Sequence, residues 1–207
     1  MSRLPLAERR AQLVQAALVV AIRDGIEAAT VRAVAAEAGV SLGVVHYCFD
    51  DKDELLREVG KAITTKNVRR IQFPAHERPD ARAALGAAFT GVWDSILENR
   101  GAQLLGFELM TTALRNPELR AVATVQLEHD SAMAEQVLTE VAVRAGIEWT
   151  VPVGRLARLC VTSINGVALA WLIDADDGAA RAALGSFVEH VASYAGPVGG
   201  AVGAASG

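Results

Sequence analysis

The sequence has little cysteine and no long uninterrupted apolar run, and each shortage excludes a class of protein. Its two cysteines, Cys48 and Cys160, lie far apart and form no C-x-x-C motif, so neither a zinc site nor a disulfide framework is predicted. The longest charge-free apolar stretch, residues 159–173, is shorter than the ~20 residues that span a bilayer. Residues 1–10 hold no apolar segment typical of a secretion signal. We therefore expect a cytoplasmic protein that does not bind a membrane.

Motifs of the common enzyme classes are also missing. The chain contains no G-x-S-x-G, H-E-x-x-H, P-loop or G-x-G-x-x-G pattern. Its four histidines, His46, His76, His129 and His190, are scattered without a recurrent metal-ligand spacing. Glu128 and Asp130 flank His129, but side chains one residue apart on a helix diverge by about 100° and do not aim at one ion. We expect no enzyme, no metal and no cofactor.

The composition favours helices. Of the 207 residues, 52% are hydrophobic and only 5% are aromatic, so alanine, valine and leucine fill the interior. The charge is uneven along the chain: residues 1–71 carry 11 Lys and Arg against 9 Asp and Glu, and residues 72–207 carry 9 against 15. A mildly basic first third on an acidic body indicates two parts with different partners, a polyanion for the first; two differently solvated faces are the alternative.

Apolar periodicity predicts an all-α protein of about nine helices, with no strand hairpin. One stripe, formed by Leu13, Ala16, Ala17, Val20 and Ala21, predicts a first helix over residues 5–24. Thr30 is placed to cap a second helix that Gly39 ends, and Ser41 to cap a third over residues 42–48. A fourth begins near residue 52 and runs to about residue 71, before a proline-containing connection over residues 73–79. Further helices are predicted at 80–99, 101–115, 117–145, 153–174 and 179–195.

The second and third predicted helices have the spacing of a helix-turn-helix. They are joined by only three residues, so they must cross closely, and the small Ala35 allows that approach. Gly39 supplies the positive φ that the turn needs. In this motif the second helix enters a DNA major groove. An ordinary corner between two helices is the alternative.

The residues left on the outside favour the DNA-binding alternative. Once Val40, Val45 and Phe49 face inward, the outward positions are Leu42, Gly43, Val44, His46 and Tyr47. Exposed Leu and Tyr beside a glycine suit a groove better than bulk water. Ser41 is placed to donate to a phosphate, Tyr47 to reach a phosphate or base edge, and Val44 to touch a thymine methyl.

The same segment carries a family resemblance. The pattern Gly39-Val40-Ser41-x-Gly43-x-Val45-His46-Tyr47-x-Phe49-x-x-Lys52-x-x-Leu55-Leu56 resembles the N-terminal domain of tetracycline-repressor (TetR) family regulators, over about residues 7–60. The resemblance implies a homodimeric, all-helical repressor that a small-molecule effector releases from operator DNA. By position it implies that Arg32 touches guanine or the backbone and that Lys52 pairs with phosphate. The implied DNA-contacting set is Arg32, Ser41, Leu42, Gly43, Val44, His46, Tyr47 and Lys52.

Two positions depart from the family pattern. His46 stands where Tyr is commoner, which weakens the phosphate contact at neutral pH. Cys48 stands where His is common, so the family's contact at that position is not carried over. The resemblance also implies how the chain divides into domains. We expect a helix-turn-helix domain at residues 1–52, a connecting helix at 53–72, a domain for effector binding and dimerisation at 79–195, and a flexible tail at 196–207.

The larger domain offers candidates for an effector site and a dimer surface. Polar groups among apolar stripes indicate a pocket, for which the candidates are Trp93, Phe107, Glu108, Met110, Thr111 and Asn165; plain core packing is the alternative. The last two helices are apolar on more than one side, which indicates a partner. Their candidate interface residues are Leu156, Ile164, Val167, Trp171, Leu184, Phe187, Val188 and Val191.

The sequence therefore predicts a ligand-responsive DNA-binding regulator that acts as a repressor on a palindromic operator. Two-fold symmetry would place two reading helices about 34 Å apart along the duplex. An activator, or a dimeric helical binding module without DNA recognition, is the alternative.

Overall fold

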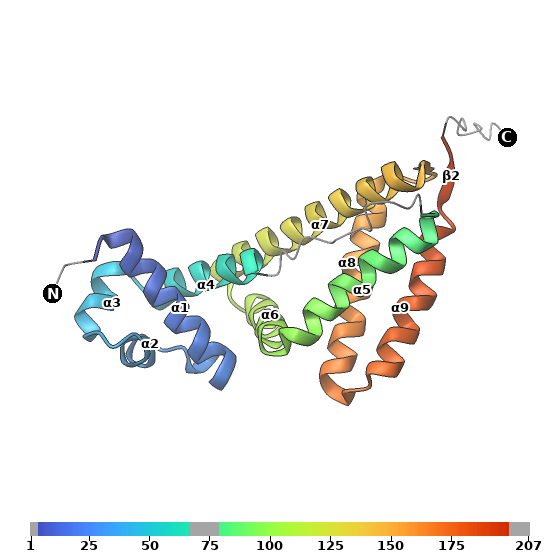
Figure 1. Ribbon diagram of the computed structural model, residues 1–207. Helices are drawn as coiled ribbons and strands as arrows, with labels where there is room; N and C mark the ends of the chain where they lie inside the picture. The colour runs from blue at the N-terminus through green and yellow to red at the C-terminus, as the bar shows by residue number, and fades with distance from the viewer. Residues whose placement is uncertain (1–3, 67–78, 199–207) are drawn as a thin grey trace. The chain divides into compact units, whose positions relative to one another are not determined.

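The structure, a computed structural model, describes residues 4–66 and 79–198, which form α-helices joined by short connections and one pair of strands (Figure 1). The chain divides into two compact units. Among the described residues, the first comprises residues 4–66 and 99–127, and the second comprises residues 79–98 and 128–198.

Each unit draws on separate parts of the sequence. The first contains α1 (Leu6–Asp24), the short 3-10 helix η1 (Ile26–Ala28), α2 (Val31–Glu37), α3 (Leu42–Cys48), α4 (Lys52–Lys66), α6 (Arg100–Ala113) and the beginning of α7 (Pro117–Ala145). The second contains α5 (Ala81–Glu98), the rest of α7, β1 (Ile147–Trp149), α8 (Val153–Asp174), α9 (Asp177–Ala192) and β2 (Ala195–Pro197). The compact units thus interleave along the chain, whereas the division expected from the sequence is linear.

Burial of one face of α1 organises the first unit. The stripe that predicts this helix lies inside the core, with Leu13, Ala17 and Val20 at most 2% exposed. The same hydrophobic cluster includes Leu105 from α6 and Leu119 from α7. Helices from far along the chain therefore complete the core beneath the first four helices.

In the second unit, α5 and α8 both pack against α9. Trp93 of α5 meets Trp171 of α8 edge to face, with ring centroids 5.6 Å apart. Phe89 of α5 meets Phe187 of α9 at 5.5 Å. Such aromatic pairs stabilise a core beyond the area that they bury.

The predicted all-α architecture is confirmed, and the helix boundaries expected from the sequence agree with those observed to within a few residues. Two features differ from the expectation. The one-turn helix η1 was not expected, and β1 pairs antiparallel with β2, so that Glu148 faces Gly196. Elements of three residues are too short to show a periodicity.

The strand pair corrects the beginning of the expected tail, because Gly196 and Pro197 belong to β2. The remainder of that tail, from residue 199, and the connection expected at residues 73–79 up to residue 78 lie outside the described residues. The part of the fourth helix expected at residues 67–71 also lies outside them.

One helix in the described part of the chain, α8, is long and apolar enough to cross a membrane by length and composition alone. A third of its most apolar window is buried inside the structure. A helix in the core of a soluble protein can be equally long and apolar. Leu156, Ala157 and Cys160 of α8 are buried in the core of the second unit.

A glycine sets the distance between α4 and the two helices beneath it. A Cβ added at Gly60 would lie 2.5 Å from Cγ1 of Val122 in α7 and 3.1 Å from Cδ2 of Leu109 in α6. Valine is stiff about χ1, so the Val122 methyl cannot swing away without a backbone shift. Only glycine allows this close approach.

We predict that Gly60→Ala destabilises the protein. The clash costs about 1–3 kcal/mol of overpacking, which exceeds the gain of about 1 kcal/mol in helix propensity. The matched control is Gly106→Ala in α6, where an added Cβ meets nothing within 4 Å, so that only the propensity gain remains. Urea denaturation measures both, and a Gly60→Ala protein as stable as Gly106→Ala would contradict the packing.

Candidate nucleic-acid interface and ligand site

The turn between α2 and α3 has the geometry that the sequence predicts. The Thr30 hydroxyl caps α2 by accepting a hydrogen bond from the Ala33 N–H at 3.2 Å. Gly39 has φ +66°, and the N–H groups of Gly39 and Val40 donate back to the carbonyls of Ala36 and Ala35. This is a Schellman ending, in which a left-handed glycine satisfies the last carbonyls of a helix. The predicted positive φ at Gly39 is confirmed.

The outward face of α3 lies where the sequence places it, except at Val44, which was expected to face outward. Tyr47 is 67% exposed and Leu42 is 41% exposed, whereas Val45 and Cys48 on the opposite face are buried. Four further DNA candidates are exposed as well: Arg32, Ser41, Gly43 and His46. Val44 is half-buried and packs against the core of the first unit. Large side chains that face solvent from a helix with a fully packed rear leave that face open for a partner.

Ser41 differs from the expectation in one respect. It stands at the N-cap of α3, but its side chain makes no capping hydrogen bond. The exposed hydroxyl is therefore open to a ligand oxygen, and the Ser41 carbonyl accepts from the Val44 N–H at 3.0 Å.

Lys52, the expected phosphate partner, begins α4 and is only partly exposed. Its Nζ lies 3.7 Å from Oε2 of Glu27 in η1, and the Glu27 side chain is 83% exposed. Because an exposed pair of this kind contributes little free energy, a phosphate can take the place of Glu27.

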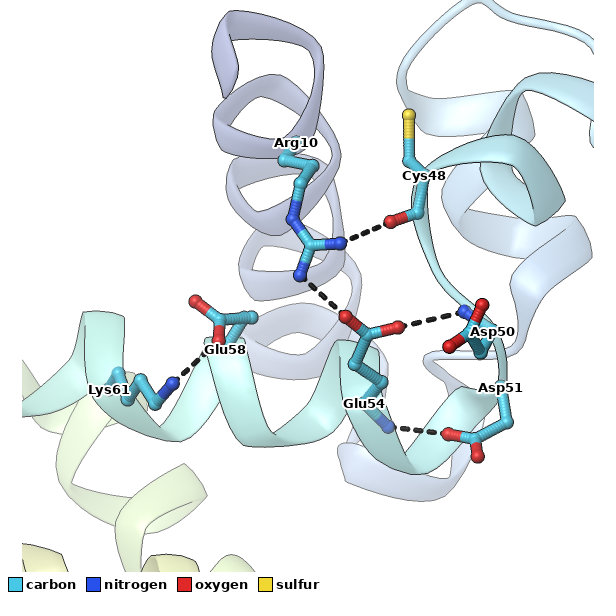
Figure 2. Close-up of polar contacts among 7 residues, drawn as sticks. All are labelled: Arg10, Cys48, Asp50, Asp51, Glu54, Glu58 and Lys61. Carbon is cyan, nitrogen blue, oxygen red and sulfur yellow. Dashed lines mark hydrogen bonds and ion pairs between the residues drawn. The ribbon is translucent and has the colours of Figure 1, made fainter. Parts of the chain in front are cut away.

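Arg10 holds the end of α3 to the beginning of α4, as Figure 2 shows. From α1 its guanidinium donates to the Cys48 carbonyl, and it donates to Oε1 of Glu54 at 2.6 Å. The guanidinium carbon also lies 4.4 Å from the ring centroid of Phe49. The Arg10 guanidinium thus donates to a carbonyl in the last turn of α3 and pairs with a carboxylate of α4. It also stacks on Phe49, which lies between the two helices.

Sequence reasoning missed Arg10. Its partners lie 38 and 44 residues away, and an arginine on the polar edge of an amphipathic helix gives no signal that distinguishes a clamp from a solvated side chain. The available signal was the aromatic residue Phe49 at the end of α3, which offers a ring face for a cation.

The second carboxylate oxygen of Glu54 also serves this junction. It accepts from the Asp50 N–H at 2.8 Å, while the Glu54 N–H donates to Asp51 at 2.6 Å (Figure 2). The hydrogen bond from Arg10, followed by that from the Asp50 backbone, lowers the pKa of Glu54 below its ordinary value. The ionised carboxylate is therefore the form that stabilises this junction.

The six ligand candidates are divided between the two compact units. Phe107, Glu108, Met110 and Thr111 lie on α6 in the first unit, and Trp93 and Asn165 lie in the second. Oε2 of Glu108 accepts a hydrogen bond from the Ile26 N–H at 2.8 Å, and the Thr111 hydroxyl donates within α6 to the Phe107 carbonyl at 2.9 Å. These two polar groups are thus occupied by the protein itself.

Trp93 lines a hollow that the sequence did not indicate. A groove of about 520 Å³ runs between α5 and α9, and its lining includes Gly86, Phe89, Trp93, Leu184, Gly185 and Val188. Two ion pairs link these helices, Arg82 with Glu189 and Arg181 with Asp94. An aromatic and apolar floor with a charged rim is the composition of a small-molecule site.

Two buried polar atoms in the second unit have no hydrogen-bond partner among the described residues. They are Nε1 of Trp93 and Nε2 of His129. Because a buried polar group without a partner is costly, each calls for an explanation, and a bound ligand is one.

Most of the expected dimer residues are occupied within the chain. Leu156, Trp171, Leu184, Val188 and Val191 are buried in the second unit. Ile164, Val167 and Phe187 are half-buried. Apolar periodicity identifies a face that is buried, but it does not tell packing within one chain from packing against a partner.

We predict that Glu54→Gln destabilises the protein at neutral pH and that this destabilisation shrinks in acid. Because the folded pKa of Glu54 lies below its unfolded value, its contribution is complete above the ordinary pKa of a glutamate, about 4.3, and disappears as the pH falls through the lowered folded pKa. The difference in denaturation midpoint between wild type and Glu54→Gln should therefore be largest near pH 7 and shrink below pH ~4.

Glu58→Gln is the matched control, since Glu58 lies on the same helix and pairs with Lys61 one turn away at 2.7 Å (Figure 2). Because Glu58 takes no part in the α3–α4 junction, its replacement should lower the denaturation midpoint at pH 7 less than Glu54→Gln does. A Glu54→Gln protein with the wild-type midpoint at every pH would show that the contact with Arg10 contributes nothing.

Two family profiles cover most of the chain. The profile described as bacterial regulatory proteins, tetR family, matches residues 13–59, and that described as the tetracyclin repressor-like C-terminal domain matches residues 77–193. The nicotine-responsive transcriptional repressor HdnoR of Paenarthrobacter nicotinovorans is 30% identical over 84% of this chain and 89% of its own length.

Solved structures agree. A transcriptional regulator from Rhodococcus sp. matches with a TM-score of 0.70 at 24% identity, covering 90% of this chain and 97% of its own. The multidrug binding protein EbrR, solved with proflavin, matches with a TM-score of 0.57 at 30% identity, covering 87% of this chain and 99% of its own.

These relatives are regulators and binding proteins rather than enzymes, as the missing enzyme motifs lead one to expect. The expected family and helix-turn-helix are confirmed. The chain belongs to the TetR family of ligand-responsive, DNA-binding transcriptional regulators.

Proposed function

We propose that the protein is a cytoplasmic repressor that binds a palindromic operator as a homodimer and is released by a small-molecule effector. The observation that carries the proposal is the exposed face of α3, where Tyr47 and Leu42 project from a helix whose rear is buried. The proposed DNA contacts are Arg32, Ser41, Leu42, Gly43, Val44, His46, Tyr47 and Lys52. The proposed domain roles remain reading of DNA by the N-terminal helices and effector binding and dimerisation by the C-terminal ones.

The dimer is supported by the outer faces of α8 and α9. Exposed residues on α8 include Leu169 and Ile173, the second of which is 82% exposed. The exposed residues of α9 are mostly small, including Ala179, Ala182, Ala183 and Ser186. Apolar and small exposed side chains allow helices of two copies to approach closely, and the half-buried Ile164, Val167 and Phe187 would complete the contact.

The proposed effector is a small nitrogen heterocycle. HdnoR is named as nicotine-responsive, and EbrR has been solved with proflavin and with imidazole. The unpartnered N–H of Trp93 requires a hydrogen-bond acceptor, which a ring nitrogen supplies. Phe89 and Trp93 line the groove between α5 and α9, and the acidic balance of residues 72–207 favours a neutral or cationic compound over an anion.

The effector site is proposed around Trp93 in the second unit, where Asn165 is a further candidate. Phe107, Met110 and Thr111 of α6 remain candidates within the first unit. The effector acts only by the difference in its affinity for the DNA-binding and the released conformation, so tight binding that is equal in both would have no effect.

The DNA-binding proposal is tested by selecting duplexes from a randomised pool with the purified protein. We expect the selected operator to contain two inverted half-sites whose centres lie one helical turn or a multiple apart. Tyr47→Ala should then weaken the operator about tenfold and a scrambled duplex much less. Lys52→Ala should weaken both similarly and reduce the salt slope by about one.

Glu27→Gln is the matched control for Lys52. It removes the acid that faces Nζ and should strengthen binding to both duplexes modestly, because the lysine then meets phosphate without a competitor. If Tyr47→Ala and Lys52→Ala both bind the operator as wild type does, the proposed DNA contacts are wrong.

The effector proposal is tested by titrating nicotine, proflavin and imidazole against the complex with the selected operator. At least one should lower operator affinity and quench tryptophan fluorescence, because the proposed site includes Trp93. Equal operator affinity with and without a compound eliminates that compound as an inducer. Failure of all three would eliminate this ligand class, and an anionic aromatic of similar size serves as the control.

A further inference from the structure

A carboxylate on α6 is bonded to the corner between α1 and α2. Oε2 of Glu108 accepts a hydrogen bond from the backbone N–H of Ile26 at 2.8 Å, across 82 residues of sequence. Both residues belong to the first compact unit. The contact therefore links a helix of the C-terminal family match to the corner that leads into the helix-turn-helix.

The Ile26 N–H needs a partner that its own segment cannot provide. Ile26 begins η1, and the first N–H groups of a helix have no partner within it. The residue at the N-cap is Gly25, which has no side chain to offer an acceptor. Ile26 is 4% exposed as a whole residue, so its backbone is held away from bulk water. Glu108 thus caps η1 from another helix.

The hydrogen bond between Glu108 and Ile26 lies close in sequence to the start of α2. Gly25 has φ +90°, a conformation open to glycine that turns the chain sharply after α1. Only Glu27, Ala28 and Ala29 separate Ile26 from Thr30, the residue that caps α2. A change at Ile26 therefore reaches the first helix of the reading motif through a very short segment.

The helix that carries Glu108 also contacts the chain just before the corner. A Cβ added at Gly101 of α6 would lie 2.7 Å from Cγ2 of Ile22 in α1. α6 is thus tightly packed against the last turn of α1 and hydrogen-bonded to the first residue of η1. A hydrogen bond weakens steeply once its atoms separate, so a small shift of α6 along α1 breaks the contact to Ile26.

We propose that Glu108 is a positioning residue for DNA binding, whose carboxylate holds the α1–α2 corner in the conformation that presents α3 to the operator. Loss of this hydrogen bond frees the corner and lowers operator affinity. The inference rests on the proposed function, and it replaces a ligand-contacting role for Glu108 with a structural link between α6 and the reading helices.

The test compares Glu108→Ala, which removes the acceptor, with Glu108→Gln, which keeps an acceptor oxygen at the same length. Gln103→Ala, another half-buried polar residue of α6, is the matched control. Three quantities are measured on the full chain: amide hydrogen exchange of the peptide spanning residues 22–30, affinity for the selected operator against a scrambled duplex, and the thermal midpoint.

For Glu108→Ala we expect faster exchange in that peptide and an operator dissociation constant raised about tenfold, with the scrambled duplex changed less than about twofold. Glu108→Gln should restore operator affinity to within about threefold of wild type, and Gln103→Ala should match wild type throughout. A general loss of stability would instead weaken both duplexes by the same factor.

Wild-type exchange in Glu108→Ala, or equal weakening of operator and scrambled DNA, would overturn the proposal. So would a Glu108→Gln protein as impaired as Glu108→Ala. If the wild-type protein selects no sequence from the pool, the proposed function fails, while the exchange of residues 22–30 still decides whether Glu108 holds the corner.

Discussion

Burial of the apolar face of α1 is the constraint on which the reading domain depends. α1 contacts α2, α3, α4 and α6, so its position determines where each of them can lie. The face is built from small and medium side chains such as Ala17 and Val20, which allow several helices to pack against one at short distance. The polar edge of the same helix carries Arg10, which ties the end of α3 to α4. α1 therefore supplies both the apolar surface on which α3 packs and the arginine that links the end of α3 to α4.

Local patterns in the sequence were sufficient for most of this domain. Gly39 and Thr30 act through their own backbone and immediate neighbours, so their roles follow from spacing alone. The outward face of α3 also followed, because assigning Val45 to the core leaves Tyr47 on the other side of a helix. These inferences needed no knowledge of distant residues.

Contacts between distant residues could not be predicted in the same way. Glu108 looked like a polar group in an apolar stripe, and nothing in its neighbourhood indicates that its partner is the N–H of Ile26. The aromatic and apolar residues of α8 and α9 showed that these helices are buried on several sides, but Trp171 and Leu184 turned out to be buried within the chain. The groove between α5 and α9 is lined in part by Gly86 and Gly185, which form no periodic signal in the sequence.

The two cysteines allow local opening of the protein to be measured through the rates at which their thiols are alkylated. Each compact unit holds one of them, Cys48 in the first and Cys160 in the second, and both are free and buried. Burial raises the pKa of the Cys160 thiol to about 12, so almost no reactive thiolate is present in the closed state. Because both sulfurs are buried, alkylation of either one requires the surrounding helices to separate locally. The labelling rate of Cys48 therefore reports local opening of the first compact unit, and that of Cys160 reports local opening of the second, without any introduced probe.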